Sequence, residues 1–284
     1  MLDWVPNVDH LPLYVAREMG FFRDEGLEVA ILAPSETSDA LKLAASGKAD
    51  LAISYPPQVI VSAARGIPLT VVGRLMEHPL STLLFLEGKG IKAPSDLAGK
   101  RIGYTVPGVM DVLLDAFARL NGIKGISTVN VGFSIVQSLA SGKVDAVMGG
   151  FRNYEVAEMV HEGMKPGFFA IEQWGIPDYD ELVFVTSPGF ARSHPEVVRA
   201  FRKALGRGIR ETLARPEKAM GLYLNAVPEA PRDLEKEAFK RTLPLLARSQ
   251  ELDPARWERL AAFSRKWKLV DRPVGVRELL WKDR

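Results

Sequence analysis

LASGKVDAVMGGFRNYE, residues 139–155, has a near copy earlier in the chain, LAASGKADLAISYP at residues 43–56. Both copies contain the pattern Ser-Gly-Lys-x-Asp, at residues 46–50 and 141–145. In each copy a helical pattern ends at the glycine, the residue that most readily adopts the left-handed conformation of a helix C-cap. The chain therefore repeats one helix-to-strand unit in two places.

The apolar runs that follow the two glycines, Leu51–Ile53 and Ala146–Met148, indicate short buried strands. Small or aromatic residues come after each run. Ligands of open α/β sheets bind beyond the carboxyl ends of the strands, so the repeat predicts two halves with a ligand between them. The alternative is that Gly-Lys-x-Asp is only a common helix-to-strand turn and that the match is a coincidence.

The bulk composition is that of an ordinary globular protein. Of 284 residues, 47% are hydrophobic and 25% are charged, which suits one large domain or two medium ones. The net charge is only +2, so we do not expect nucleic-acid binding through a basic surface. The absence of cysteine excludes thiol catalysis, disulfides and cysteine-ligated metals, and no apolar run approaches 18 residues, so no membrane span is expected.

The predicted elements form two α/β series in succession. The first begins with strands at Leu2–Val5 and Leu27–Leu32 and ends with a strand at Leu69–Leu75. The second restarts with a strand at Arg101–Thr105. Alternation of strands and helices favours a mostly parallel sheet.

The strand-like segments Ser81–Leu86 and Leu182–Thr186 flank the second series. We interpret them as strands that cross between two lobes, one outgoing and one returning. The chain after them is helical, beginning with an amphipathic pattern at His194–Leu213. This predicts a first lobe made of residues 1–80 and 187–284 and a second lobe made of residues 81–186.

No pattern typical of a catalytic or metal site is present. The four histidines lack the i, i+4 spacing of a metal-binding helix, and the chain has neither a Gly-x-Ser-x-Gly nor a Gly-x-Gly-x-x-Gly motif. Gly47-Lys48 is not a phosphate loop, because its order is helix, loop, strand. We therefore predict no catalytic residue, no metal and no cofactor, and a protein that binds a ligand without converting it.

Polar and aromatic residues gather instead at the ends of predicted strands. A flat heteroaromatic ligand needs such a set, since aromatic rings stack on its faces and carboxylates or amides pair with its ring nitrogens and amino groups. The predicted ligand-binding residues are Trp4, Asn7, His10, Tyr14, Tyr55, Gly108, Arg152, Asn153, Tyr154, Glu155, Tyr179 and Glu181. Several have a structural alternative: Trp4 as a core residue, Asn7 and Asn153 as helix caps, His10 as a buried structural histidine, Tyr154 and Glu155 as surface residues, and Tyr179 as part of a turn.

Several motifs match a known family. The opening LDWVPN at residues 2–7, with LYVA at 13–16, GGFRNYE at 149–155 and YDELV at 179–183, resembles the thiamine-pyrimidine family. That family groups solute-binding proteins of bacterial ABC importers with fungal hydroxymethylpyrimidine-phosphate synthases. The resemblance runs from residue 2 to about residue 225, and within the family it is nearest to the proteins that bind formylaminopyrimidine.

Three departures from the synthases favour the binding-protein branch. Ser54 stands where the synthases carry the lysine that holds pyridoxal phosphate, and Gln58 stands where they carry the histidine consumed as substrate. The chain also lacks their cysteine-rich run. The resemblance therefore implies a type II periplasmic-binding-protein fold, which is an α/β fold of two lobes joined by two crossing strands, with a ligand cleft between them.

The function implied by the resemblance is capture of a pyrimidine precursor of thiamine, of the formylaminopyrimidine or hydroxymethylpyrimidine type, for an ABC importer. The expected partners are that ligand and the ABC permease subunits, with no nucleic acid. The resemblance also implies a periplasmic or extracellular protein that reaches the membrane through a permease or an N-terminal anchor, although this sequence shows no signal peptide. The alternatives are an enzyme of pyrimidine biosynthesis and a receptor for another planar ligand such as riboflavin.

Overall fold

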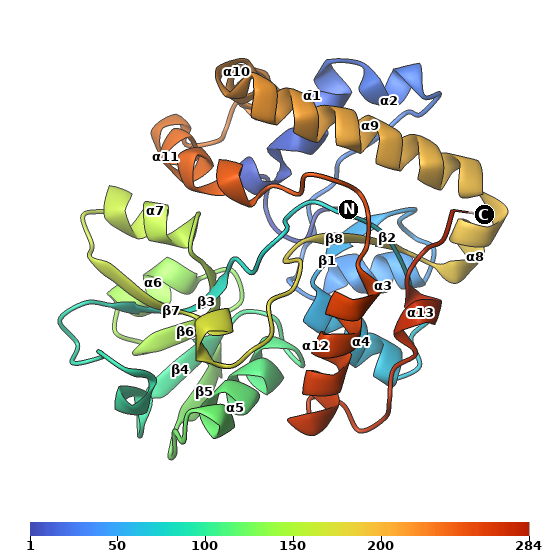
Figure 1. The fold of residues 1–284 in the computed structure, drawn as a ribbon. Coiled ribbons are helices and arrows are strands. Elements are labelled where there is room, and N and C mark those ends of the chain that lie inside the picture. Colours follow the sequence, from blue (N-terminus) through green and yellow to red (C-terminus); the bar gives the residue numbers. More distant parts are fainter. Residues whose placement is uncertain (284) are drawn as a thin grey trace.

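The computed structural model describes residues 1–283, which form two β-sheets surrounded by helices (Figure 1). The smaller sheet has the strand order β1-β8-β2 and the larger sheet the order β5-β4-β6-β3-β7. The strands are β1 (Ala52–Ser54), β2 (Thr70–Arg74), β3 (Ser81–Leu86), β4 (Arg101–Tyr104), β5 (Ser127–Asn130), β6 (Ala146–Phe151), β7 (Pro166–Ala170) and β8 (Val183–Thr186).

In each sheet, one strand directly follows a segment that crosses over from the other sheet. Strand β3 runs antiparallel between β6 and β7, and β8 runs antiparallel between β1 and β2. The pairs β4–β5 and β4–β6 are parallel. The prediction of a mostly parallel sheet is therefore wrong for the smaller sheet, because the returning strand inserts between two strands that would otherwise be parallel neighbours.

Helices cover both sheets and form a separate layer above the smaller one (Figure 1). The helices from the first half of the chain are α1 (Leu11–Glu18), α2 (Phe21–Asp24), α3 (Asp39–Ala45), α4 (Pro56–Ala64), α5 (Met110–Leu120), α6 (Ile135–Ala140) and α7 (Glu155–His161). Those from the second half are α8 (Pro188–Ser193), α9 (Pro195–Ala214), α10 (Pro216–Ala226), α11 (Arg232–Thr242), α12 (Pro254–Lys266) and α13 (Val276–Leu279). Short 3₁₀ helices are η1 (Val8–His10), η2 (Pro94–Leu97), η3 (Ile171–Trp174) and η4 (Leu243–Leu245).

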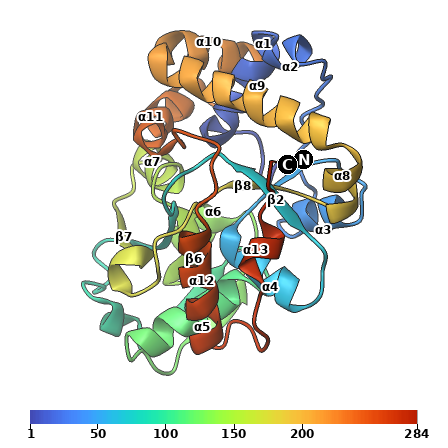
Figure 2. The same cartoon turned by 45° about the vertical axis from the view of Figure 1, so that its right-hand side comes forward.

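The C-terminal helices return to the smaller sheet. Helix α9 packs against α1 and α2, and α12 packs against α4 and α13. The turned view shows α12 and α13 standing in front of α4 and the smaller sheet (Figure 2). Helix α11 instead reaches across to α7, which belongs to the larger sheet.

The repeated unit has the predicted structure. Helices α3 and α6 each end two residues before the repeated glycine, and β1 and β6 follow. Gly47 has φ of 73° and Gly142 has φ of 70°, the left-handed conformation that a glycine C-cap supplies. Both glycines are therefore used as the sequence predicts.

Two predicted strands, Leu2–Val5 and Leu27–Leu32, are not strands in the structure. The N–H of Leu2 donates to the carbonyl of Leu32 at 2.7 Å, and the N–H of Ile53 donates to the carbonyl of Met1 at 3.0 Å. The chain then bends over residues 3–6, so the extended segments share too few hydrogen bonds to continue a ladder. That bend directs Trp4 into the space between the sheets.

Two segments carry the chain between the sheets: residues 75–80, between β2 and β3, and residues 175–182, between η3 and β8. The carboxylate of Glu181 ties them together, accepting the N–H of Leu80 at 2.6 Å and the N–H and hydroxyl of Ser81 at 2.9 and 2.8 Å. The division into lobes remains a proposal. Since β8 pairs within the smaller sheet, we would end the second lobe near Leu182 rather than at residue 186.

Candidate ligand-binding site

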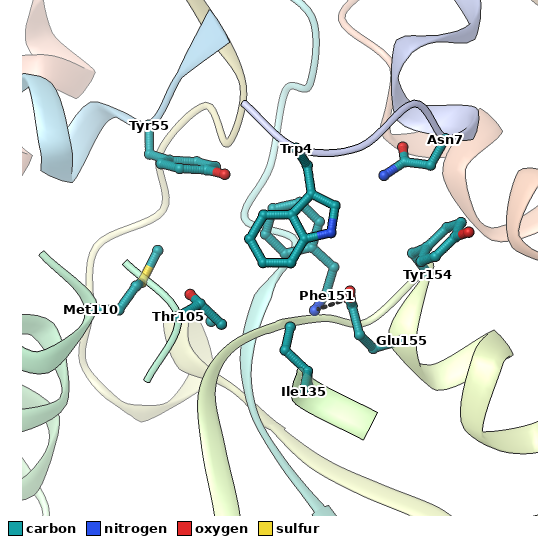
Figure 3. Close-up of a pocket in the computed structure, with 10 residues that line it drawn as sticks. Trp4, Asn7, Tyr55, Thr105, Met110, Ile135, Phe151, Tyr154 and Glu155 are labelled. Atoms are coloured by element: carbon teal, nitrogen blue, oxygen red, sulfur yellow. Dashed lines mark hydrogen bonds between the residues drawn. The ribbon is translucent and has the colours of Figure 1, made fainter. Parts of the chain in front are cut away.

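A pocket lies between the two sheets, at the ends of strands from both (Figure 3). It is lined by Trp4, Asn7, Tyr55, Thr105, Met110, Ile135, Gly149, Phe151, Tyr154 and Glu155. The cavity measures about 10 Å³, which is close to the least that can hold one water molecule. A ligand therefore has to move side chains, or the two sheets, to enter.

Aromatic side chains from both halves of the chain make up much of the wall. The indole of Trp4 lies in the middle of the pocket (Figure 3) and meets Phe133 edge-on, with ring centroids 4.4 Å apart. Tyr55, directly after β1, faces Phe151, at the end of β6, at 6.4 Å between centroids. Flat rings supplied from opposite sides suit a flat ligand placed between them.

The polar group of the pocket that stands out is Glu155, the first residue of α7. One of its carboxyl oxygens accepts the N–H of Phe151 at 2.7 Å (Figure 3). The side chain is only 6% exposed, and burial raises the pKa of Glu155 to about 8. The group can therefore act as a neutral acid or as a carboxylate near neutral pH, depending on what the ligand offers.

A buried hydrogen-bond chain holds one wall of the pocket. The hydroxyl of Tyr55 donates to Asp3 at 2.6 Å, and the other oxygen of Asp3 lies 3.0 Å from Nε2 of His10. The N–H of Asn7 donates to Nδ1 of His10 at 3.3 Å, so the ring proton sits on Nε2, which donates to Asp3. His10 thus positions the pocket residues Asn7 and Tyr55 without itself lining the pocket.

Asn7 serves two purposes. Its side-chain oxygen accepts the N–H of Asp9 at 2.9 Å and caps η1, as in the structural alternative. Its side chain also lines the pocket. Capping and ligand binding are therefore compatible at this position.

The Asn153-Tyr154-Glu155 motif divides between two environments. The side-chain amide of Asn153 donates to Asp9 at 2.5 Å and to Thr242 at 2.7 Å, outside the pocket. The ring of Tyr154 lines the pocket, while its hydroxyl donates to Glu235 at 3.1 Å. Only Tyr154 and Glu155 therefore face a ligand in this arrangement.

Three other predicted residues lie where the chain crosses between the sheets. Glu181 bonds the two crossing segments, and burial raises its pKa to about 7. Arg152 pairs with Glu172 at 2.9 Å and also donates to the carbonyl of Pro79. Tyr179 is 1% exposed and buried in the same region. None of the three is among the residues that line the pocket.

Two further predicted residues also lie away from the lining. Tyr14 packs edge-on against Tyr223, with centroids 5.4 Å apart, within a cluster of helices α1, α10 and α11. Gly108 has φ of 75°, and a β-carbon there would lie 3.3 Å from the Arg65 guanidinium across the gap between the sheets. The glycine therefore allows the two halves of the chain to approach each other closely at this point.

Sequence reasoning missed Thr105, Met110 and Ile135 as lining residues and named Gly149 and Phe151 only as residues after a strand. Gly149 has φ of 97°, and a β-carbon would lie 2.4 Å from the Thr105 hydroxyl. The Gly149-Gly150 pair was the feature of the sequence from which this close approach could have been predicted. Nothing in their local pattern distinguishes Met110 and Ile135 from core residues.

Among residues 1–283, no group of three or more histidine, cysteine, aspartate or glutamate side chains is placed to hold a metal ion. Across the same residues, every helix is too short or too polar to span a membrane.

Several known proteins are similar to this chain over nearly its whole length. A Haemophilus influenzae protein, provisionally named as a thiamine biosynthesis protein, is 37% identical over 282 residues, which cover 98% of this chain and 89% of that protein. The formylaminopyrimidine-binding protein of Halalkalibacterium halodurans is 32% identical over 284 residues, which cover 96% of this chain and 86% of that protein. The 4-amino-5-hydroxymethyl-2-methylpyrimidine phosphate synthase of Legionella pneumophila is 29% identical over 281 residues, which cover 97% of this chain and 88% of that protein.

The fold is also found among solved structures. A Candida albicans gene product described as having the generic periplasmic binding protein fold superposes with a TM-score of 0.77 at 15% identity, covering 100% of this chain and 96% of that one. The predicted periplasmic-binding-protein fold is thus confirmed. The sequence profile described as NMT1/THI5 like matches residues 7–219, and the chain therefore belongs to the NMT1/THI5-like family.

Proposed function

We propose that this protein is the substrate-binding component of an ABC importer and captures a pyrimidine precursor of thiamine, of the formylaminopyrimidine or hydroxymethylpyrimidine type. The observation that carries the proposal is the convergence of a buried carboxyl group, Glu155, with Trp4, Tyr55 and Tyr154 in one pocket between two sheets. The similarity to a formylaminopyrimidine-binding protein over nearly the whole chain supports it.

In the proposed complex the pyrimidine ring takes the space now filled by the indole of Trp4, which moves to stack on it. An aminopyrimidine presents an amino donor beside a ring nitrogen. One oxygen of Glu155 stays with the Phe151 N–H, and the other oxygen, as a carboxylate, accepts from the amino group of the ligand or from a protonated ring nitrogen. Glu155 can reach the carboxylate form near neutral pH, because its pKa lies at about 8.

Ligand capture would close the two lobes about the segments 75–80 and 175–182. A ligand favours the closed state by the contacts that it makes only there. In this proposal the protein works outside the cytoplasm, in the periplasm or at the cell surface, and hands its ligand to permease subunits. Trp4 and Glu155 come from opposite sides of the pocket, so both contacts need closure.

The second candidate is a synthase, since several relatives bear that name. The features opposing it are at Ser54 and Gln58: the Ser54 hydroxyl donates to the Gln58 side chain at 2.8 Å, and both are buried. Neither residue can form a Schiff base with pyridoxal phosphate or replace a consumed histidine.

The test is calorimetry with formylaminopyrimidine, hydroxymethylpyrimidine, thiamine, riboflavin and pyridoxal phosphate. We expect one-to-one binding of a pyrimidine, unchanged on recovery, and no Schiff-base absorbance with pyridoxal phosphate. Tight binding of riboflavin alone, or conversion of a bound ligand, would refute the proposal.

A further inference from the structure

Beside the pocket lies a second polar cluster, here called the polar lock, which consists of Asp9, Asn153, Tyr154, Glu235 and Thr242. Asn153 and Tyr154 precede α7 on the larger sheet, whereas Asp9 belongs to η1, and Glu235 and Thr242 belong to α11. Figure 1 shows α7 facing α11 across the gap between the two halves. The polar lock therefore joins the lobes beside the ligand pocket and meets the pocket only at the ring of Tyr154.

Hydrogen bonds run across this junction in two places. Asn153 donates to Asp9 and to Thr242, and the Thr242 hydroxyl also lies 3.2 Å from Asp9. Tyr154 donates to Glu235. Separating the lobes would break the bonds from both Asn153 and Tyr154 at once.

The polar lock is buried and incompletely paired. Asp9, Asn153, Thr242 and Glu235 are all 0% exposed. Within the part of the chain described, one oxygen on each of Asp9, Asn153 and Glu235 has no hydrogen-bond partner. A buried carboxylate oxygen without a donor is costly, and a proton on the carboxyl group relieves that cost.

The charged groups around Asp9 and Glu235 also favour the protonated form of these two carboxyl groups. Asp9 itself acts on Glu235, and the other titratable groups that act on the two carboxyl groups are Asp3 and His10 from the N-terminal segment, Glu155 and Tyr154 at the start of α7, and Tyr223 on α10. His10 is the only basic side chain among them, and it is bonded to Asp3. Burial raises the pKa of Asp9 to about 6 and that of Glu235 to about 8.

We propose that the polar lock is a latch that holds the two lobes closed independently of ligand, and that its carboxyl groups make closure proton-linked. Opening exposes Glu235 to water, where its pKa returns towards its ordinary value and its proton is lost at neutral pH. Closure therefore takes up a proton. Raising the pH from 6 towards 8 should lower the closed-to-open ratio by about tenfold per pH unit for each proton taken up.

The test uses the ligand-free protein, so its outcome does not depend on the proposed function. Because the chain has no cysteine, dyes can be attached through Lys124→Cys on the larger-sheet half and Glu217→Cys on α10, both exposed positions. Energy transfer between the dyes then reports the closed fraction from pH 6 to pH 9. We expect the wild-type closed fraction to fall as the pH rises.

Glu235→Gln should remove about one proton from this pH dependence. Glu162→Gln is the matched control: it removes an exposed carboxylate at the C-terminal end of α7, outside the polar lock, and should leave the pH dependence unchanged. Tyr154→Phe removes one bond without a charge change and should lower the closed-to-open ratio at pH 6 by at least about fivefold. Equal pH dependence in wild type and Glu235→Gln, with both folded by circular dichroism, would overturn the proposal. So would a Tyr154→Phe variant as closed as wild type.

Discussion

Replacing Glu155 with glutamine gives the sharpest test of how the pocket recognises its ligand. In the wild type one carboxyl oxygen is already taken by the N–H of Phe151, at 2.7 Å, which leaves one oxygen for the ligand. Glutamine has a single oxygen and an amide nitrogen that can only donate. If the glutamine oxygen accepts the Phe151 N–H, the glutamine NH₂ group faces the amino group of the ligand, and two donors meet. If the side-chain amide is rotated by half a turn, its oxygen faces the ligand, but its NH₂ group then faces the Phe151 N–H, and again two donors meet.

Either orientation loses one hydrogen bond at a buried site, which costs about 1–3 kcal/mol. The dissociation constant for formylaminopyrimidine should therefore rise by roughly 5- to 150-fold. Calorimetry measures this, with the melting temperature of the ligand-free protein as a check on folding. Glu162→Gln, at the other end of α7 and outside the pocket lining, is the matched control and should bind as wild type.

A dissociation constant for Glu155→Gln within twofold of wild type, with an unchanged melting temperature, would refute this reasoning. Glu155 would then serve only to accept the Phe151 N–H and to complement the start of α7. The ligand would have to be recognised by the aromatic walls and Asn7.

Three further changes test the fold around the site. Arg256→Met removes a 2.9 Å ion pair from buried Asp180 and should lower the unfolding free energy, measured by urea denaturation, by about 1.5–3 kcal/mol. An unchanged unfolding free energy would mean that Arg74, the other ion-pair partner of Asp180, is sufficient to stabilise its carboxylate. Gly149→Ala would place a methyl group against Thr105 at a residue with positive φ, and it should destabilise the protein by about 1–3 kcal/mol. Its control is Gly221→Ala, which places a methyl group in open space within α10 and should stabilise the protein by about 0.5–1 kcal/mol. Equal melting temperatures for the two variants would contradict this. The unfolding free energy should fall by about 1.4 kcal/mol per pH unit for each glutamate that is protonated only in the folded protein, from about pH 5 up to the folded pKa of that group. Those pKa values are about 7 for Glu181 and about 8 for Glu155 and Glu235, so the curve should level off above pH 8; rising stability between pH 5 and pH 8 would show that the three groups are ionised in the folded protein.

The sequence predicted the architecture because local chemistry decides it. Glycine C-caps at Gly47 and Gly142 fix the two helix-to-strand turns, and apolar runs fix the strands that follow. Strand partners are a different matter, since they depend on segments distant in sequence. The insertion of β8 between β1 and β2 leaves no trace in the pattern of Val183–Thr186 itself.

The site was predictable where a residue type has few other uses after a strand end. Tyr55 and Glu155 belong to this group and line the pocket, whereas Trp4 lines it from a bend in a segment predicted as a strand. Arg152 and Glu181 carry the same residue types at similar positions, yet they bond the crossing segments instead. Only the tertiary arrangement decides between those two uses, because each residue lies within a few positions of a strand end.

The exchange of strands between the sheets has a consequence for how the protein is made. Every strand of the larger sheet lies within one continuous stretch, residues 81–170, whereas the smaller sheet lacks its middle strand until residue 186 has left the ribosome. The larger sheet can therefore assemble first during synthesis, while β1 and β2 wait with unpaired edges. The nascent chain thus exposes its aggregation-prone edges for the time needed to translate more than a hundred residues, and this interval is when a chaperone would be of most use to it.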